Sequence, residues 1–247
     1  MLKRTLLDKL EKLVGKDNME VRLDGVFVSP KNTSQVSDIV LLANENKFRI
    51  LPSGAGSTLD FSQPASDNTV ILKSGRMNQI NKVVPEDLYV ILEPGFQLRD
   101  LNRQLEPYHL FCPLAGSKSS GTIGGAVASG LQGKSGDRDI QIKDYVLALE
   151  VVDPQGQILN IGARTFKSVS GYDLPRLFIG SWGTLGVITE ISLRLIPIIQ
   201  RKYFPHFLPD HFQRNREEIR QDLKSSVSFR IKCALDPQST FFDLISI

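Results

Sequence analysis

Apolar residues in the first third of the chain recur with helix spacing and strand spacing in turn. Residues 2–14 and 34–45 place apolar side chains three or four positions apart, which predicts two helices with one buried face each. Residues 21–28, 48–51 and 70–73 are short apolar runs and predict strands. The order strand, helix, strand predicts a small lobe whose parallel strands are joined by a right-handed crossover.

The rest of the chain predicts a second, larger sheet with short helices. Strand-like runs lie at residues 88–93, 145–152, 157–161 and 187–195, and helix-like runs at 97–105 and 173–180. The turn Asp153-Pro154-Gln155-Gly156 makes a hairpin of the second and third of these strands. Beyond Pro197 the pattern changes: residues 210–224 predict a charged helix and the alternating residues 226–235 predict a strand.

The strand at 48–51 leads into a turn of small residues, Leu51-Pro52-Ser53-Gly54-Ala55-Gly56-Ser57-Thr58-Leu59. Small side chains let several backbone N–H groups converge on one point, and such a nest suits a phosphate or pyrophosphate. The hydroxyl groups of Ser53, Ser57 and Thr58 add donors at its rim. A run of this composition is also common in ordinary turns, so alone it leaves both interpretations open.

Two further glycine-rich segments follow. Residues 113–133 form a long stretch of small residues, and a compact domain seldom carries so long a loop without a function for it. Residues 122–129 within it are either part of this loop or a short helix whose N-terminus would favour an anion beside the first turn. Residues 180–186 form the third segment and lead into the strand at 187–195.

Composition and charge exclude several classes of function. The chain of 247 residues is 41% hydrophobic and 23% charged with a net charge of +3, which is typical of a globular protein. It has no basic cluster with interleaved aromatic residues, so we expect no nucleic-acid partner. Two distant cysteines and three scattered histidines give neither a disulfide framework nor zinc-site spacing, so no metal is expected. We find no signal peptide and no apolar run long enough to span a bilayer, and we expect a cytoplasmic protein without a transmembrane segment.

Five segments in order carry a family resemblance. They are residues 51–58, Gly121-Thr122-Ile123-Gly124-Gly125, Lys143-Asp144-Tyr145-Val146, Gly171-Tyr172-Asp173-Leu174 and residues 180–189. This set resembles the PCMH-type FAD-binding domain of the vanillyl-alcohol oxidase family, found in glycolate oxidase FAD-binding subunits and D-lactate dehydrogenases. The dinucleotide-binding Rossmann alternative fails, because no GxGxxG opens a helix after the first strand.

The resemblance implies a two-lobed α+β fold, with a small strand-helix-strand lobe and a larger mixed or antiparallel sheet lobe with flanking helices. Its implied divisions are an N-terminal helix over 1–20, the FAD-binding domain over 21–197 with lobes at about 21–75 and 76–197, and a helix-strand tail over 198–247. Full-length relatives continue into a cap domain that covers the flavin, and the tail resembles a remnant of that cap.

The resemblance also implies which residues bind FAD. The first turn would hold the pyrophosphate through Pro52, Ser53, Gly54, Ala55, Gly56, Ser57 and Thr58. The second segment would lie along the pyrophosphate, ribityl chain and flavin ring through Gly116, Ser117, Gly121, Thr122, Gly124, Gly125, Ser129, Gly130 and Gln132. The third would receive the adenosine end through Trp182, Gly183, Gly186, Val187 and Ile188.

This chain departs from the family at several positions. The first turn has no histidine to tether the flavin, so we expect non-covalent FAD. Ala55 stands where many relatives have glycine, and its methyl group is tolerable if its φ is not positive. Trp182 would either stack on the adenine or pack in the core. No catalytic residue can be assigned, and Arg138 and Arg164 are interpreted as surface charges.

The resemblance therefore implies a flavoprotein oxidoreductase subunit that oxidises a 2-hydroxy acid, such as glycolate or lactate, by hydride transfer to FAD. An alternative is an accessory subunit that holds FAD for electron transfer and has no substrate site of its own. A third alternative is a remnant of such a protein with an empty pocket. The intact glycine turns argue against it. In the first two cases we expect other subunits of an oxidoreductase complex or a homo-oligomer as partners.

Overall fold

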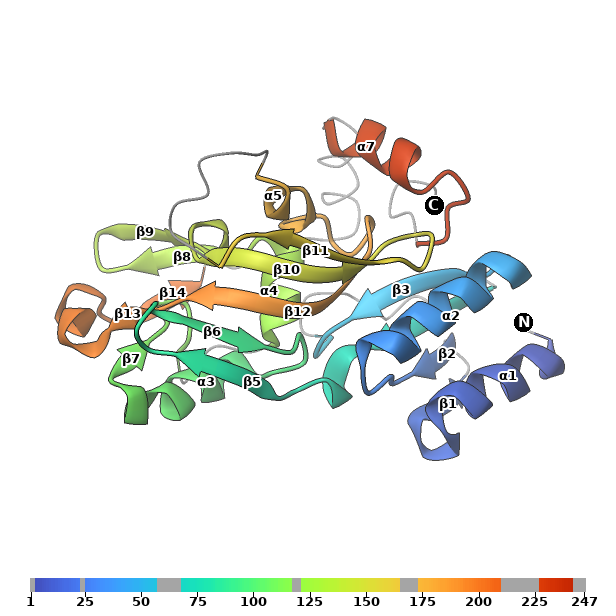
Figure 1. The fold of residues 1–247 in the computed structure, drawn as a ribbon, viewed down its shortest axis with the longest axis horizontal. Coiled ribbons are helices and arrows are strands. Elements are labelled where there is room, and N and C mark those ends of the chain that lie inside the picture. Colours follow the sequence, from blue (N-terminus) through green and yellow to red (C-terminus); the bar gives the residue numbers. More distant parts are fainter. Residues whose placement is uncertain are drawn as a thin grey trace.

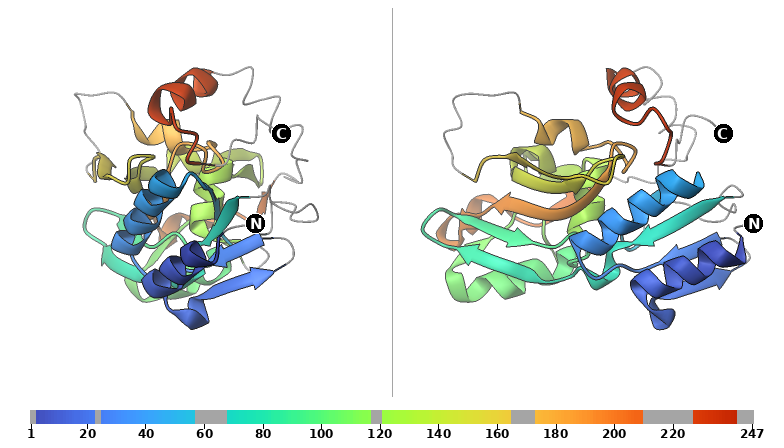
Figure 2. Two further views of the ribbon diagram at one scale, coloured as in Figure 1. Left: turned by 90° about the vertical axis from the view of Figure 1, so that its right-hand side faces the viewer. Right: turned by 45° about the vertical axis from the view of Figure 1, so that its right-hand side comes forward.

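The computed structural model describes residues 3–22, 25–56, 68–116, 121–164, 173–209 and 227–241. A small sheet and a large sheet lie next to each other along the long axis of the molecule, each with its own hydrophobic core (Figure 1 and Figure 2). This is the two-lobed α+β fold that the sequence predicts. We call the sheet β1–β4 with α1 and α2 the small lobe, and the sheet of β5, β6 and β10–β12 with its packed helices the large lobe.

The small lobe contains a four-stranded sheet in the order β1-β2-β4-β3. Its strands are β1 (Met19–Arg22), β2 (Gly25–Val28), β3 (Arg49–Ser53) and β4 (Thr69–Lys73). β2 and β3 both pair in parallel with the central β4, as the predicted crossover requires. The prediction of one strand over 21–28 was wrong, because β1 and β2 form an antiparallel pair in which Arg22 faces Gly25. The Asp24-Gly25 dipeptide is a sequence signal typical of a hairpin.

Two predicted helices complete the core of the small lobe. α1 (Arg4–Val14) and α2 (Thr33–Asn46) contribute buried apolar side chains at helical spacing. Asn32 caps α2, since its Oδ1 accepts a hydrogen bond of 2.9 Å from the backbone N–H of Gln35. Both helices contribute to one core cluster with β2, β3 and β4.

The large lobe contains a five-stranded antiparallel sheet in the order β11-β10-β12-β6-β5. Its strands are β5 (Ile80–Val84), β6 (Tyr89–Leu92), β10 (Val146–Val152), β11 (Ile158–Gly162) and β12 (Val187–Arg194). Four of them were predicted. The edge strand β5 was not, because the polar pair Asn81-Lys82 interrupts its short apolar pattern.

Short helices and ladders surround the large sheet. The helices are α3 (Leu98–Leu105), α4 (Ile123–Ser129) and α5 (Pro175–Phe178). The ladders join β7 (Leu110–Phe111) to β13 (Ile196–Pro197), and β8 (Gln132–Ser135) to β9 (Arg138–Gln141) and β14 (Phe207–Pro209). α4 resolves the alternatives left open for residues 122–129 in favour of a short helix. Within the described ranges no helix is long and apolar enough to cross a membrane.

The end of the described chain contains a helix where we predicted a strand. α7 (Val227–Leu235) covers the alternating residues 226–235, while the helix predicted over 210–224 lies outside the described residues. The buried Lys232 side chain pairs with Asp236 four residues later, a spacing that suits a helix and not a strand. Lys232 Nζ also donates to the carbonyl of Phe241 at 3.1 Å. Alternation over nine residues was therefore a poor discriminator of strand from helix.

The segment after α7 returns to the edge of the small sheet. The N–H of Ile50 donates to the carbonyl of Thr240 at 2.7 Å, and Ile50 forms a parallel bridge with Phe241. Phe241 is fully buried in the core of the small lobe. The chain thus covers the outer edge of β3, the strand that leads into the first glycine turn.

Candidate cofactor-binding site

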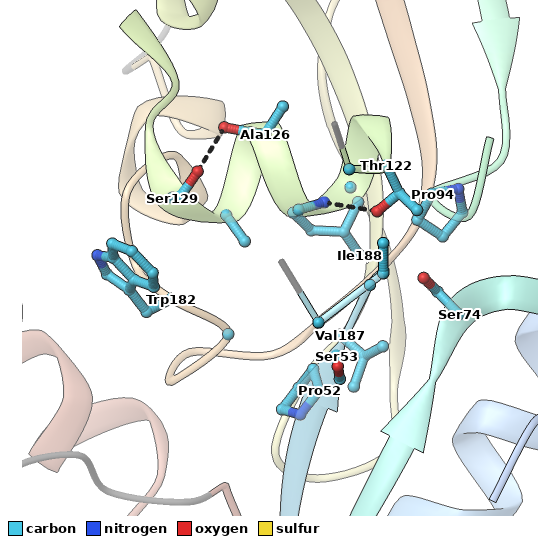
Figure 3. Close-up of a pocket in the computed structure, with 18 of the residues that line it drawn as sticks. Pro52, Ser53, Ser74, Pro94, Thr122, Ala126, Ser129, Trp182, Val187 and Ile188 are labelled. Atoms are coloured by element: carbon cyan, nitrogen blue, oxygen red, sulfur yellow. Dashed lines mark hydrogen bonds between the residues drawn. The ribbon is translucent and has the colours of Figure 1, made fainter. Parts of the chain in front are cut away.

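The three glycine-rich segments meet around one pocket between the lobes (Figure 3). The pocket encloses about 930 Å³, including space open to solvent. The small lobe contributes Pro52, Ser53, Gly54, Ala55 and Gly56 after β3, and Leu72 and Ser74 at the end of β4. The large lobe contributes Pro94, Leu98, Gly121, Thr122, Gly124, Gly125, Ala126, Ala128, Ser129 and Leu131, and then Trp182, Gly183, Gly186, Val187 and Ile188.

Most of the sequence-predicted site residues line this pocket. The structure brings together Pro52–Gly56, Gly121, Thr122, Gly124, Gly125, Ser129, Trp182, Gly183, Gly186, Val187 and Ile188. Gly116, Gly130 and Gln132 are not among the lining residues: Gly130 caps the C-terminus of α4 with a φ of +69°, and Gln132 begins β8. The remaining predicted residues, Ser57, Thr58 and Ser117, lie outside the described residues.

Sequence reasoning missed several lining residues, and one of them had a usable signal. Ser74 directly follows β4, which runs parallel to β3. The carboxyl ends of parallel strands meet at one edge of a sheet, so Ser74 belongs beside Ser53. The other missed residues, Leu72, Pro94, Leu98, Ala126 and Ala128, are apolar or small and carry no such signal.

Glycine is required where backbone segments of the pocket approach each other closely. A Cβ atom on Gly54 would lie within 3.0 Å of Thr122 Oγ1, and one on Gly124 would meet the backbone carbonyl of Pro94 at 2.8 Å. Gly183 has a φ of +75° and faces the ring of Pro52. Side chains at these positions would fill or distort the cradle. The methyl group of Ala55 is compatible with the turn, because this residue does not have a positive φ.

No side chain in the described lining is ionisable. Within this lining, the groups that can hold an anion are backbone N–H and hydroxyl groups. The N–H groups of Gly54, Ala55 and Gly56 donate to no acceptor in the described part of the chain. Ser53 and Ser74 are buried at the pocket wall, and within the same residues their hydroxyl groups make no hydrogen bond.

The N-terminus of α4 lies beside the first turn, as one of the two interpretations of this segment required. Its amides are engaged, however. The N–H of Ile123 donates to the Phe96 carbonyl at 2.9 Å, and that of Gly124 to the Pro94 carbonyl at 2.8 Å. The third, of Gly125, donates to Thr122 Oγ1 at 3.2 Å. These three amides therefore have protein acceptors, and among the described residues the amides without one lie in the first turn.

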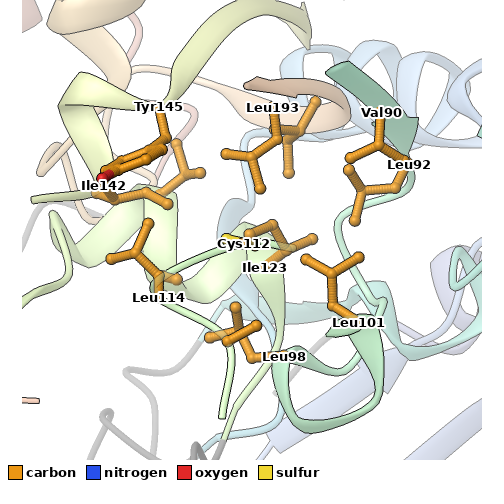
Figure 4. Close-up of a cluster of buried hydrophobic side chains, with 14 of the residues drawn as sticks. Val90, Leu92, Leu98, Leu101, Cys112, Leu114, Ile123, Ile142, Tyr145 and Leu193 are labelled. Carbon is orange, nitrogen blue, oxygen red and sulfur yellow. The ribbon is translucent and has the colours of Figure 1, made fainter. Parts of the chain in front are cut away.

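A hydrophobic core fixes α4 against the rest of the large lobe (Figure 4). Ile123 is fully buried in the same core cluster as Leu98 and Leu101 of α3 and as Cys112. Burial raises the pKa of the Cys112 thiol to about 12, so this cysteine stays protonated and is a packing residue. The pocket wall formed by α4 is therefore preorganised by packing.

Trp182 is the only tryptophan of the chain and has an unusual backbone conformation. Its φ is +56°, a region that costs a non-glycine residue on the order of 1 kcal/mol. The backbone N–H of Trp182 donates to the Ala128 carbonyl at 2.8 Å and fixes it beside α4. The half-buried indole forms one wall of the pocket (Figure 3), where backbone strain of this kind is common.

Arg138 and Arg164 make structural contacts away from the pocket. Arg164 forms an ion pair of 2.9 Å with Glu190, and the guanidinium of Arg138 lies over the rings of Tyr203 and Phe204. Neither arginine lines the pocket. Among the described residues no group of three or more His, Cys, Asp or Glu side chains could hold a metal ion.

Comparisons with known proteins point to one family. A family model described as FAD binding domain matches residues 25–162, more than half of the chain. The mitochondrial D-lactate dehydrogenase (cytochrome) of Arabidopsis thaliana is 39% identical over 180 residues, covering 73% of this chain and 32% of the relative. Glycolate oxidase subunit GlcD of Bacillus subtilis is 36% identical over 171 residues, covering 69% of this chain and 36% of the relative. The chain thus spans about a third of the length of these curated relatives.

A solved structure supports the fold. An alkyldihydroxyacetonephosphate synthase superposes with a TM-score of 0.69 at 20% identity, covering 80% of this chain and 41% of that one. Within the described residues the cradle has no ionisable side chain and has amides without an acceptor, which fits a dinucleotide whose pyrophosphate is held by backbone donors. The chain belongs to the FAD-binding domain family, and its cofactor is FAD.

Proposed function

We propose that the pocket binds FAD without a covalent bond and holds its pyrophosphate on the first glycine turn. The observation that carries this proposal is the set of three backbone N–H groups at Gly54, Ala55 and Gly56, which have no acceptor among the described residues. They lie in a pocket without an ionisable lining side chain. Ser53 and Ser74 add two hydroxyl donors at the same wall.

The other two segments take the rest of the cofactor in this proposal. The face of α4 from Thr122 to Ser129 lies along the ribityl chain and flavin, because its small side chains leave a flat surface. The turn from Trp182 to Ile188 receives the adenosine end, with the indole as an aromatic wall. We further propose that the FAD-binding domain extends over residues 21–197, with lobes at about 21–75 and 76–197, and that residues 198–247 follow it as a tail whose described parts pack on both lobes.

We propose that the chain takes part in the oxidation of a 2-hydroxy acid. The names of its relatives, a D-lactate dehydrogenase and a glycolate oxidase subunit, support this substrate class. When bound, FAD supplies the acceptor for the hydride that leaves the hydroxyl-bearing carbon. The described lining can bind and orient this cofactor, but it contains no carboxylate, imidazole or amine to take the hydroxyl proton. We propose that another subunit of an oxidoreductase complex, or another copy of the chain, completes the substrate site.

The compartment proposed for this activity is a reducing one such as the cytoplasm. Both cysteines are unpaired, Cys112 in the core and Cys233 at the surface. Unpaired cysteines are usual where thiols are kept reduced.

Anaerobic reduction tests the proposed reaction. The FAD-loaded chain is mixed with glycolate, D-lactate or L-lactate, alone and with co-purifying proteins, and the visible flavin absorption is followed. A 3-hydroxy acid of similar size is the matched control, since its hydroxyl group is one carbon too far from the carboxylate. Bleaching by a 2-hydroxy acid and not by the control supports the proposal. A flavin that dithionite bleaches but no 2-hydroxy acid reduces, with or without partners, contradicts it.

A further inference from the structure

Glu150 joins the two lobes next to the pocket without lining it. Its Oε1 accepts a hydrogen bond of 2.7 Å from Thr33 Oγ1 and one of 2.8 Å from Thr189 Oγ1. Thr33 is the first residue of α2 in the small lobe, and Thr189 lies in β12 of the large lobe. One carboxylate oxygen therefore connects an element of each lobe.

The Thr189 side of this contact is directly continuous with the pocket wall. Thr189 follows Ile188, which lines the pocket, and its side chain is only 2% exposed. The register of β10 and β12 shifts at this point, because Glu150 faces Glu190 while Val151 faces Ile188. Thr189 is thus the extra residue of a β-bulge, a feature that redirects side chains beside functional sites.

Through Thr33 and α2, Glu150 is also linked to the pocket wall that the small lobe forms. α2 packs against β3, whose end carries the Ser53–Gly56 turn. α2 also docks on the β10–β11 turn: Ser37 Oγ donates to the Gly156 carbonyl at 2.6 Å, and Asn44 Nδ2 to the Pro154 carbonyl at 2.8 Å. These acceptors are neutral. The carboxylate of Glu150 makes charge-assisted hydrogen bonds, which are about twice as strong as neutral ones.

We propose that Glu150 is a positioning residue that sets the distance between the two walls of the FAD pocket. This inference rests on the proposed cofactor site. Without its carboxylate the N-terminus of α2 loses its fixed point on β10 and, through Thr189, its link to β12, so the first turn shifts relative to Val187 and Ile188 on the other wall. An amide oxygen at this position can accept hydrogen bonds from the same two hydroxyl groups, so glutamine retains the link through weaker bonds.

Glu190 provides a matched control on the neighbouring strand. It is the cross-strand partner of Glu150, and its carboxylate accepts hydrogen bonds of 2.9 Å from Arg164 and from Asn81. Asn81 lies in β5 and Arg164 follows β11, so these contacts stay within the large lobe. Replacing Glu190 removes a carboxylate of the same type without releasing the small lobe.

The test measures the FAD dissociation constant of the full chain by titration of the apoprotein, together with the melting temperature of each apoprotein. Glu150→Ala is expected to weaken FAD binding by about tenfold or more, whereas Glu150→Gln and Glu190→Ala stay within about threefold. The apoprotein melting temperatures of Glu150→Ala and Glu190→Ala are expected to be similar. If Glu150→Ala does not fold, Thr33→Val removes the same link and is expected to weaken FAD binding in the same direction.

Three results would overturn the inference. One is equal FAD affinity in Glu150→Ala and Glu190→Ala, and the second is failure of Glu150→Gln to retain affinity. The third, where Glu150→Ala does not fold or melts far below Glu190→Ala, is an FAD affinity of Thr33→Val equal to that of Glu190→Ala. These results differ from a failure of the proposed function, in which the unmodified chain and the Glu190→Ala control would also bind no FAD.

Discussion

Gly54 and Thr122 hold two segments of the cofactor cradle in contact. The backbone of Gly54 approaches the Thr122 side chain so closely that a Cβ atom there would fall within 3.0 Å of Oγ1. Thr122 at the same time caps α4 through its bond to the Gly125 amide. This single approach joins the first glycine turn to the helix at the other side of the pocket, 68 positions along the chain from Gly54 to Thr122.

This approach predicts the effect of a side chain at Gly54. Gly54→Val should lower FAD affinity by about a hundredfold or more, because the turn must move away from α4 and its three amides no longer converge. Gly75→Val is the control, since a Cβ atom at Gly75 meets nothing within 4 Å. Flavin absorbance of both variants after gel filtration measures retention. Equal retention by Gly54→Val and Gly75→Val would show that the cradle lies elsewhere.

The single tryptophan gives a direct optical test of the third segment. Binding of FAD should quench the emission of Trp182, because the indole lines the pocket. Trp182→Gly should weaken FAD binding by about tenfold through loss of the aromatic wall. Its free energy of unfolding should change by only about 1 kcal/mol, since glycine relieves the left-handed backbone. Trp182→Phe, which keeps a ring, should bind more tightly than Trp182→Gly; the reverse order would exclude an aromatic contact.

The state of Cys112 predicts a dependence of stability on pH. Burial raises the pKa of its thiol to about 12, above its value in the unfolded chain, and burial also raises the pKa of Tyr145. The folded state therefore binds these protons more tightly than the unfolded chain does. The free energy of unfolding keeps its full value below about pH 9 and declines as the pH rises toward about 12. Each group contributes at most about 1.4 kcal/mol per pH unit in its range.

Urea unfolding at several pH values measures this decline. Cys112→Ala should reduce the slope above about pH 9, although its free energy of unfolding at neutral pH is lower because of the cavity. In the native chain only the exposed Cys233 should react with a thiol reagent at neutral pH. Rapid reaction of both thiols in the folded protein would contradict the buried, protonated state.

The buried ion pair between Lys232 and Asp236 predicts a large loss of stability when the Asp236 side chain is replaced by alanine. Asp236→Ala removes the ion-pair partner of Lys232, whose side chain is 5% exposed, and should destabilise the chain by about 3–5 kcal/mol. It also removes the acceptors of the Thr240 and Phe241 amides, which position the tail on β3. Asp173→Ala breaks the exposed pair with Arg176 and should cost less than about 1 kcal/mol. Chemical denaturation measures the free energy of unfolding of both variants. A similar loss in the two would indicate that Lys232 is exposed to solvent, and would contradict a buried ion pair.

The sequence predicted the parts of the fold in which local patterns and tertiary contacts agree. α2 has helical spacing and a capping asparagine, and β12 alternates over its length, so both were found. The failures have physical causes. The 226–235 segment alternates like a strand, but the contacts of Lys232 with Asp236 and Phe241, which tertiary packing creates, favour α7.

The candidate site was predictable to a similar degree. Glycine turns mark close backbone approach, and two of them do line the pocket, through Pro52–Gly56 and through Trp182, Gly183, Gly186, Val187 and Ile188. Which amides remain free was not predictable, because the bonds from α4 to Pro94 and Phe96 depend on how distant segments pack. The role of Glu150 has no local signal either, since its two partners lie 117 and 39 positions away in the chain.

The FAD content of the folded chain tests the central claim most directly. The purified protein is reconstituted with FAD, passed through gel filtration and denatured, and the released flavin is compared with the protein concentration. We predict about one FAD per chain, released intact on denaturation because no covalent tether forms. A chain with native circular dichroism that retains no FAD after reconstitution would contradict the account.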